Sequence, residues 1–146
     1  MAKTVVGITE SVTIIAGKNV KTYAVFDTGA RLTSIDIKLA GEAQVGPIIR
    51  TTKVKNPSLK VKTTRPVVLI KVRIKGKVYE CEANIQDRSH MTAPMIIGRN
   101  VIAGNFIVDA SKNLKKFNEM RRLKGMPESH GIRRIADFSG GKGTKK

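Results

Sequence analysis

The chain has 146 residues and a mass of 15.9 kDa, the size of one domain with its own core, which leaves no room for two sizeable domains. Lys and Arg number 28 against 11 Asp and Glu, a net charge of +17 that is typical of proteins bound to a polyanion such as nucleic acid. Hydrophobic residues make up 40% of the chain, a globular balance that excludes wholesale disorder.

The first 110 residues indicate β-structure, because β-branched residues dominate the apolar runs and turn residues separate them. The last two expected strands form a hairpin that turns at Lys75-Gly76, since glycine supplies the positive φ of a tight turn. A short helical turn is expected near Arg99–Ala103. The predicted strands are Val5–Ile8, Val12–Ala16, Thr22–Phe26, Ile35–Leu39, Gln44–Ile49, Lys60–Thr63, Val67–Ile74 and Lys77–Ile85.

Beyond residue 110 the apolar residues recur at every third position among Lys and Arg, which predicts a basic amphipathic helix over residues 111–125. Ser111 suits its N-cap and Gly125 its end. We expect the apolar stripe to pack on the sheet, and residues 126–146 to form a basic Gly/Lys-rich tail. The stripe consists of Leu114, Phe117, Met120 and Leu123.

Cofactor, metal and membrane signals are weak in this sequence. Cys81 is the single cysteine, and no Cys or His spacing suits zinc, so we expect no metal site and no cofactor. The apolar stretch after Lys3 is interrupted by Thr9-Glu10-Ser11, so it fails as a signal peptide and as a membrane span. We therefore expect a cytoplasmic protein with no membrane partner.

The positive charge is concentrated in two zones. No acidic residue lies between Glu42 and Glu80, where ten cations fall, and the last 36 residues hold +8 of the total charge. Lys71, Arg73 and Lys75 alternate along a predicted strand, so they share one face with no Glu among them, which favours contact with phosphates over an ordinary solvated face. The cations predicted to bind RNA are Arg50, Lys53, Lys55, Lys60, Lys62, Lys71, Arg73, Lys75, Lys115, Lys116, Arg121, Arg122, Lys124, Arg133, Arg134, Lys142, Lys145 and Lys146.

Two short motifs stand out against this background. An apolar strand runs directly into Asp27-Thr28-Gly29, which delivers a carboxylate at a tight turn where the glycine permits close backbone approach. A second apolar strand, Met95-Ile96-Ile97, ends in Gly98-Arg99-Asn100, where the glycine lets another segment pass closely. Asp27 has two interpretations, a catalytic carboxylate or a turn residue that serves the fold through its hydrogen bonds.

In this order the two motifs resemble those of the retropepsin-like aspartic proteases. The flanking blocks Arg65-Pro-Val67, Asp87–Met91 and Phe106–Asp109 look most like the bacterial and archaeal family called ATP-dependent zinc proteases, over roughly residues 4 to 112. Nothing in the sequence suits a zinc protease or a phosphate-binding loop. The resemblance implies an all-β, retropepsin-like (acid-protease) closed barrel or sandwich over residues 1–110, with the basic helix and tail appended.

For activity, the resemblance implies an aspartic endopeptidase in which two carboxylates share a proton and activate water. One chain offers one Asp27, so a homodimer is needed, with Thr28 bracing the pair and Gly29 giving clearance. A segment between Pro47 and Arg65 corresponds to the flap over an extended peptide. Many relatives have a histidine where this chain has Asp36, and relatives are often associated with ligases that add glutamates, so the cationic flap is read as a grip for acidic peptides or for phosphates.

Two functions follow from these observations. Because a peptidase needs no such charge, the sequence favours an RNA-binding protein, ribosomal or ribosome-associated, that contacts ribosomal RNA and neighbouring ribosomal proteins. The alternative is a homodimeric aspartic peptidase with Asp27 as its catalytic carboxylate, acting on acidic peptides.

Overall fold

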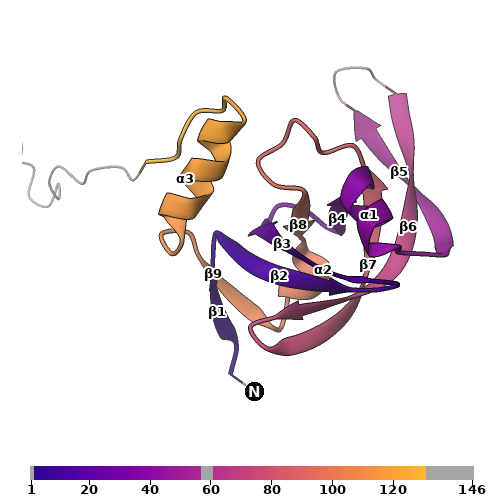
Figure 1. Cartoon of the computed structure of the whole chain (residues 1–146), viewed down its shortest axis with the longest axis horizontal. Coiled ribbons are helices and arrows are strands. Elements are labelled where there is room, and N and C mark those ends of the chain that lie inside the picture. The colour runs from indigo at the N-terminus through magenta and orange to yellow at the C-terminus, as the bar shows by residue number, and fades with distance from the viewer. Residues whose placement is uncertain (1, 57–60, 131–146) are drawn as a thin grey trace, which may run out of the picture.

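The computed structural model describes residues 2–56 and 61–130. Strands dominate this part of the chain, and three helices interrupt or follow them (Figure 1). The elements are β1 (Thr4–Gly7), β2 (Thr9–Ile15), β3 (Asn19–Phe26), β4 (Thr33–Asp36), α1 (Ile37–Ala43), β5 (Ile48–Asn56), β6 (Val61–Ile74), β7 (Lys77–Gln86), β8 (Met95–Ile97), α2 (Arg99–Ile102), β9 (Phe106–Asp109) and α3 (Leu114–Leu123).

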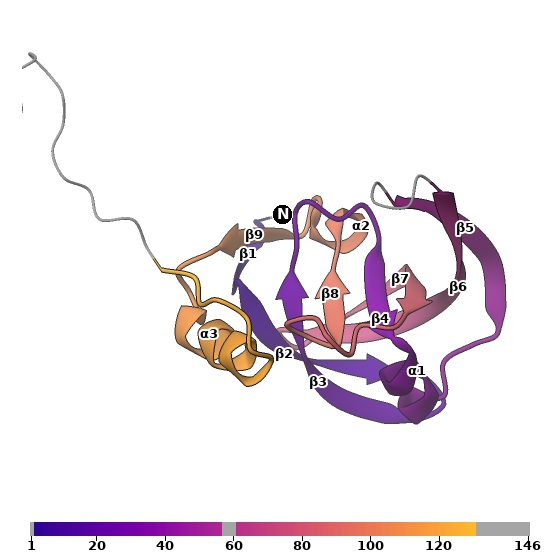
Figure 2. The ribbon, with the colours of Figure 1, turned by 90° about the horizontal axis from the view of Figure 1, so that it is seen from above.

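Six strands close into a barrel. Their order is β2-β3-β8-β4-β7-β6, and pairing between β2 and β6 closes the ring, while β5 extends outward from β6. Short β8 lies between β3, to which it is parallel, and β4, to which it is antiparallel (Figure 2). The predicted all-β closed barrel is therefore confirmed.

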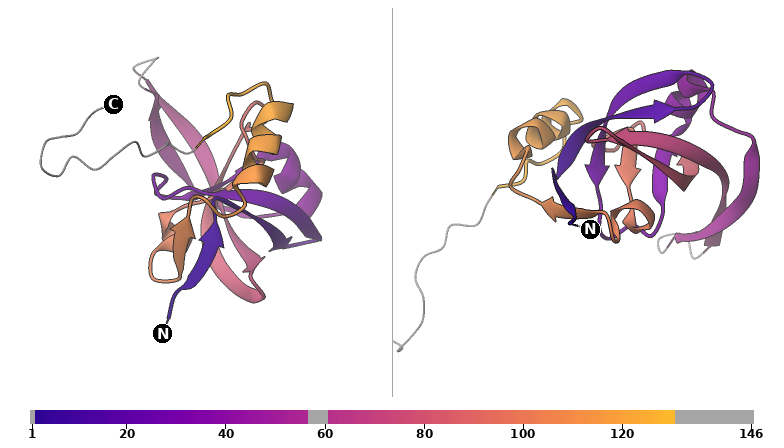
Figure 3. Two further views of the ribbon diagram at one scale, coloured as in Figure 1. Left: turned by 90° about the vertical axis from the view of Figure 1, so that its left-hand side faces the viewer. Right: turned by 90° about the horizontal axis from the view of Figure 1, so that it is seen from below.

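The core fills the inside of this barrel with aliphatic side chains. Ile14, Ile35, Ile74, Met95 and Ile97 are fully buried, and they come from four different strands. Outside the barrel, β1 pairs in parallel with β9, and this two-stranded ribbon lies at one end of the molecule beside α3 (Figure 3). The N- and C-terminal parts of the described chain thus meet at this end.

The two longest strands, β6 and β7, form the hairpin that the sequence predicts. β6 and β7 turn at Lys75 and Gly76, whose φ values are 52° and 81°, so the predicted hairpin is confirmed. β6 also contains Pro66, at a point where only β5 pairs with it, because pairing with β7 begins at Val67. A proline is tolerated there because the strand needs no donor on its second edge.

The prediction of one strand over Ile35–Leu39 is wrong, because β4 ends at Asp36 and a helix follows. The Asp36 carboxylate accepts a hydrogen bond from Lys38 N at 3.0 Å and so caps α1. α1 ends where Gln44 takes a left-handed conformation, so the predicted strand Gln44–Ile49 is confined to the start of β5 at Ile48. Of the predicted strand Lys60–Thr63, Lys60 lies outside the described residues and the rest belongs to β6.

The helix after residue 110 forms, but its ends and its packing differ from the prediction. Ser111 is not the N-cap, because its backbone and hydroxyl both donate to the Asp109 carboxylate; α3 begins at Leu114 instead. Gly125, with a φ of 68°, ends the helix as predicted. Only Phe117 of the apolar stripe is buried, and Leu123 is 80% exposed, so the stripe as a whole does not pack on the sheet.

Candidate active site

The first candidate residue, Asp27, follows β3 directly at the edge of the barrel. Its backbone N–H donates to Ile97 O of the neighbouring β8 at 2.8 Å, which continues the β3–β8 pairing into the turn. Its carboxylate accepts a hydrogen bond from Gly29 N at 2.8 Å. A Cβ at residue 29 would lie 3.2 Å from the same carboxylate oxygen, so glycine keeps the space beside this oxygen open. A backbone N–H of the turn itself therefore orients Oδ1 of Asp27.

The second motif, Gly98-Arg99-Asn100, binds the Asp27 turn through hydrogen bonds to its backbone carbonyls. Arg99 N donates to Ala30 O at 2.7 Å, and the Arg99 guanidinium donates to Thr28 O at 3.1 Å. A Cβ on Gly98 would lie 2.5 Å from the carbonyl carbon of Leu32, so only glycine permits the close passage of that segment. The predicted role of Gly98 is confirmed, and the spacing of the two motifs reflects direct contact between them.

Asn100 completes the same brace one residue further on. Its side-chain oxygen accepts hydrogen bonds from both the backbone N–H and the hydroxyl of Thr33, each at 3.0 Å. The Thr33 hydroxyl in turn accepts from Gly98 N. The segment from Asp27 to Thr33 is thus fixed at both ends by Gly98, Arg99 and Asn100, whose bracing role the sequence motif alone did not reveal.

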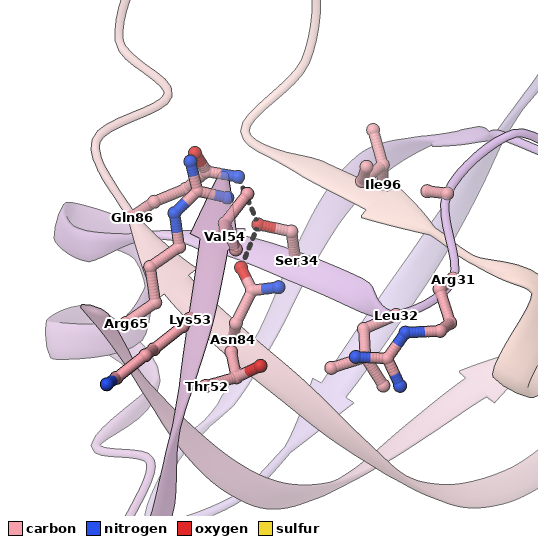
Figure 4. A pocket seen from close by; sticks show the side chains of 11 residues that line it. Arg31, Leu32, Ser34, Thr52, Lys53, Val54, Arg65, Asn84, Gln86 and Ile96 are labelled. Carbon is pink, nitrogen blue, oxygen red and sulfur yellow. Dashed lines mark hydrogen bonds between the residues drawn. The ribbon is translucent and has the colours of Figure 1, made fainter. Parts of the chain in front are cut away.

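A cleft of about 350 Å³ opens between this braced segment and the β5–β6 hairpin (Figure 4). Its walls come from residues that directly follow the Asp27 turn on one side and from β5 and β6 on the other. The floor is polar and belongs to β4 and β7. The lining residues are Ala30, Arg31, Leu32, Ser34, Thr52, Lys53, Val54, Arg65, Asn84, Gln86 and Ile96.

The floor residues form a short hydrogen-bonded chain that sequence analysis missed. Gln86 Nε2 donates to Ser34 Oγ, and Ser34 Oγ donates to Asn84 Oδ1, both at 2.7 Å. Parallel pairing of β4 with β7 sets Ser34 beside Asn84. No signal in the sequence identifies this set, because Ser34 lies 50 residues before Asn84 and 52 before Gln86, and only the strand register brings them together.

Asp27 also borders a second hollow on the side that faces α3. Asp27 and Thr28 line it together with Val108 and Phe117, and its volume is about 360 Å³. The Asp27 turn therefore lies between two open regions of the surface. The cleft under the hairpin begins at Ala30, three residues after Asp27.

Asp36 and Arg88 form a buried polar contact beside the site. The Asp36 carboxylate accepts from Arg88 N at 2.7 Å, and the Arg88 guanidinium donates from Nε to Ala93 O at 3.1 Å. Burial lowers the pKa of Arg88, and the nearby carboxylates of Asp27 and Asp36 oppose that shift. Asp36 thus joins α1 to the loop after β7, and its carboxylate serves the fold where the sequence left its role in substrate recognition open.

The cations predicted to bind RNA do not form an acid-free surface. Lys71 lies opposite Glu80 in the register of β6 and β7, and Lys75 Nζ lies 3.4 Å from Glu10 of β2. Arg50 forms an ion pair with Glu82. Neighbouring strands therefore supply the acidic residues that are missing from the sequence between 42 and 80.

The cations of α3 are similarly engaged within the protein. Lys116 pairs with Glu119, Arg122 with Glu128, and Lys124 donates to Ser89 O of the loop after β7. Arg121 donates to Thr92 Oγ1 of the same loop. Lys115 is exposed. The side chains of Lys55 and Lys62 are not described, and Lys60, Arg133, Arg134, Lys142, Lys145 and Lys146 lie outside the described residues.

Metal and membrane features are absent from the described part of the chain. Across residues 2–56 and 61–130, no three His, Cys, Asp or Glu side chains gather as they would around a metal ion. In the same ranges, none of the helices has the length and apolar composition needed to cross a bilayer.

Comparison with known proteins gives the class to which this fold and site belong. The family described as "RimB-like: Retropepsin-like aspartic endopeptidase RimB" matches residues 38–119, more than half of the chain. The chain therefore belongs to the RimB-like family of retropepsin-like aspartic endopeptidases. The matched residues begin after the Asp27 turn, so the role of Asp27 is argued from its geometry. None of the curated protein sequences matches this chain.

Solved structures show the same fold. Lpg0085 of Legionella pneumophila, a protein of unknown function, has a TM-score of 0.52 and 21% identity over 75% of this chain and 95% of its own. The EIAV protease, solved with the inhibitor HBY-793, has a TM-score of 0.50 and 15% identity over 64% of this chain and 83% of its own. The simian foamy virus protease has a TM-score of 0.50 and 16% identity over 64% and 90%. The predicted retropepsin-like fold is confirmed.

These findings overturn the function that the sequence favoured. The prediction of an RNA-binding, ribosomal or ribosome-associated protein is wrong, because the chain belongs to a family of retropepsin-like aspartic endopeptidases and shares its fold with two viral proteases. The charge count misled because it does not register acids contributed by neighbouring strands, such as Glu10, Glu80 and Glu82.

Proposed function

We propose that this protein is an aspartic endopeptidase that works as a homodimer, with Asp27 of each copy in one shared site. The observation that carries the proposal is the braced turn, in which Gly29 N orients the Asp27 carboxylate and the Arg99 guanidinium donates a hydrogen bond to Thr28 O. A carboxylate fixed at the end of a strand beside a cleft suits a catalytic group.

The chemistry requires two such carboxylates at close range. They share one proton, because two like charges cannot both remain ionised at that distance. The ionised carboxylate takes a proton from water, whose oxygen attacks the peptide carbonyl carbon, while the protonated carboxyl donates its proton to the carbonyl oxygen. The carbon–nitrogen bond then breaks as the carboxyl that took the proton of water gives it to the leaving nitrogen, and the other carboxylate removes a proton from a hydroxyl of the tetrahedral intermediate, which restores the shared proton. One chain contributes a single Asp27-Thr28-Gly29 turn, so the second carboxylate comes from a partner copy.

The substrate in this proposal is an extended acidic peptide. It lies in the cleft between the Asp27 turn and the β5–β6 hairpin, where an extended chain can pair with strand edges. Arg31, Lys53 and Arg65 line that cleft, and the net charge of +17 attracts acidic chains from solution. Among the described residues, none that lines the same cleft is acidic.

Cleavage of acidic peptides by the purified full chain tests this proposal. Asp27→Asn should lower kcat by about a thousandfold or more, because general acid and base catalysis is lost. Glu42→Gln makes the same carboxylate-to-amide change on the exposed face of α1 and should leave the rate unchanged. The wild-type rate should follow a bell-shaped pH profile, because one carboxyl must be protonated and the other ionised. Undiminished cleavage by the Asp27→Asn protein would falsify the proposal.

A further inference from the structure

The hydrogen bonds in the polar floor of the cleft all donate in one direction, from Gln86 to Ser34 to Asn84. Ser34 and Asn84 are 1% and 6% exposed, and Gln86 is half-buried beside them. Gln86 Nε2 donates to Ser34 Oγ, so the Ser34 hydroxyl is left to donate its own hydrogen to Asn84 Oδ1. The amide oxygen of Asn84 is therefore already engaged by Ser34.

This arrangement leaves the amide nitrogen of Asn84 as the group offered to the cleft. Within the part of the chain that the structure describes, no hydrogen bond from Asn84 Nδ2 is formed, and this nitrogen points away from Ser34 toward the side of the cleft where Leu32 and Arg31 lie (Figure 4). The Ser34 bond prevents the amide from turning its oxygen outward without loss of that bond. Asn84 is thus set as a hydrogen-bond donor.

The walls around this donor add positive charge. Arg65 of β6 pairs across the hairpin with Thr52 of β5, and both line the cleft together with Lys53. The ion pairs formed among the described residues engage other cations, so Arg31, Lys53 and Arg65 have no carboxylate within 4.0 Å there. The cleft presents donors and cations, and its lining contains no acidic residue from residues 2–56 and 61–130.

We propose that this cleft is a subsite for one substrate side chain that ends in a carboxylate, with Asn84 as its hydrogen-bond donor and Arg65 as its cation. The inference rests on the proposed peptidase function and assigns specificity residues within it. A carboxylate has only acceptors to offer, which suits a lining of donors. A side-chain amide would turn N–H groups toward Asn84 or Arg65, and an apolar side chain would leave Asn84 Nδ2 buried without a partner.

Binding to an inactive protein tests the subsite apart from catalysis. The protein is the full chain with Asp27→Asn, and the readout is fluorescence anisotropy of labelled short peptides. In each peptide pair, one member has Glu and the other Gln at a given position, and a second Glu/Gln exchange at the amino-terminal residue keeps the net charge equal. One pair is made for each position, so the preferred register need not be known beforehand.

At one position the Glu member should bind about tenfold or more tightly, as expected for a charge-assisted hydrogen bond in a shielded site. Arg65→Met should remove this preference, whereas Arg73→Met, an equal charge change on exposed β6 outside the cleft, should leave it intact. Asn84→Asp, which replaces the donor by an acceptor, should favour the Gln member. Circular dichroism verifies that each variant is folded, and Arg65→Met carries the test if Asn84→Asp fails to fold.

The outcomes separate this inference from the proposed function. Equal binding of Glu and Gln at every position, absence of binding, or equal losses in Arg65→Met and Arg73→Met would overturn the subsite. A Glu preference that depends on Arg65, in a wild-type protein that cleaves none of these peptides, would retain the subsite and overturn the peptidase. Cleavage without any such preference would retain the peptidase and overturn the subsite.

Discussion

At the scale of single residues, Asp36 shows how a carboxylate beside a candidate active site can serve the fold. It is 7% exposed, and its two oxygens bind two separate segments. Oδ2 accepts from Lys38 N at the start of α1, and Oδ1 accepts from Arg88 N in the loop after β7. The side chain therefore fixes both the helix and the loop that ends near β8.

Replacing the Asp36 carboxylate should lower the free energy of unfolding, more for alanine than for asparagine. Asp36→Ala removes the helix cap and the contact with Arg88 N, so we expect a loss of about 2–4 kcal/mol in the free energy of unfolding. Asp36→Asn keeps a side-chain oxygen for one of the two bonds and should lose less. Urea unfolding followed by circular dichroism measures both variants. An Asp36→Ala protein as stable as the wild type would contradict this role.

Cys81 gives a pH dependence at the same scale. It is 7% exposed in β7, and burial raises the pKa of its thiol to about 11. The folded state therefore keeps the thiol protonated at a pH where the unfolded state has begun to ionise. The stability that this residue contributes is complete below about pH 9 and is lost as the pH rises toward about 11.

Comparison with Cys81→Ala isolates that contribution. Between about pH 9 and 11 the wild type should lose about 2 kcal/mol more unfolding free energy than the alanine variant loses. The two proteins share every other ionisable group, so the difference between the two curves reports the thiol. Parallel curves over this range would show that the thiol is accessible. Slow reaction of the native thiol with a disulfide reagent at pH 8 provides an independent check.

At the scale of elements, the sequence predicts what is encoded locally and misses what depends on neighbours. The hairpin at Lys75-Gly76 is predicted because both the strand pattern and the turn residue lie in one short stretch. Helix α1 is missed because it spans seven residues whose apolar content resembles a strand, and its start depends on the Asp36 cap. The Asp109 carboxylate likewise captures Ser111 and moves the start of α3 to Leu114.

The orientation of α3 yields a prediction from two residues of one helix. Phe117 is 8% exposed and borders the hollow beside Asp27, whereas Leu123 is 80% exposed. Phe117→Ala should lower the free energy of unfolding by about 2–4 kcal/mol, through lost burial and the cavity left behind. Leu123→Ala should change it by about 0.5 kcal/mol or less, because an exposed side chain has little packing to lose. Chemical denaturation measures the free energy of unfolding of both variants. Similar losses for the two would mean that Leu123 is packed as well, as the sequence predicts for the whole apolar stripe.

At the scale of the whole molecule, the sequence predicts one half of the candidate site and misses the other. The Asp27 turn and the Gly98 motif are predicted because each is a continuous stretch with its own strand. The floor of the cleft is missed because Ser34 and Asn84 meet only through the β4–β7 register. The excess charge was misread for the same reason, since Glu10 and Glu80 reach the cationic strands from other parts of the sheet.

A site shared between two copies has a consequence that no monomeric enzyme has. If Asp27 of both copies is required, a wild-type chain paired with an Asp27→Asn chain forms an inactive dimer. With equal amounts of the two proteins, subunit exchange pairs about half of the wild-type chains with inactive partners, so activity per wild-type chain falls to about half. With a large excess of Asp27→Asn, activity approaches zero even though the wild-type concentration is unchanged.

The control uses Glu42→Gln as an active diluent, which should leave activity per active chain constant. Sedimentation at the assay concentration should give twice the chain mass for the active sample. Activity that is insensitive to added Asp27→Asn protein, measured after time for exchange, would mean that each chain acts alone. Since one chain supplies one Asp27-Thr28-Gly29 turn, that result would exclude paired Asp27 catalysis whatever the rate of the wild type.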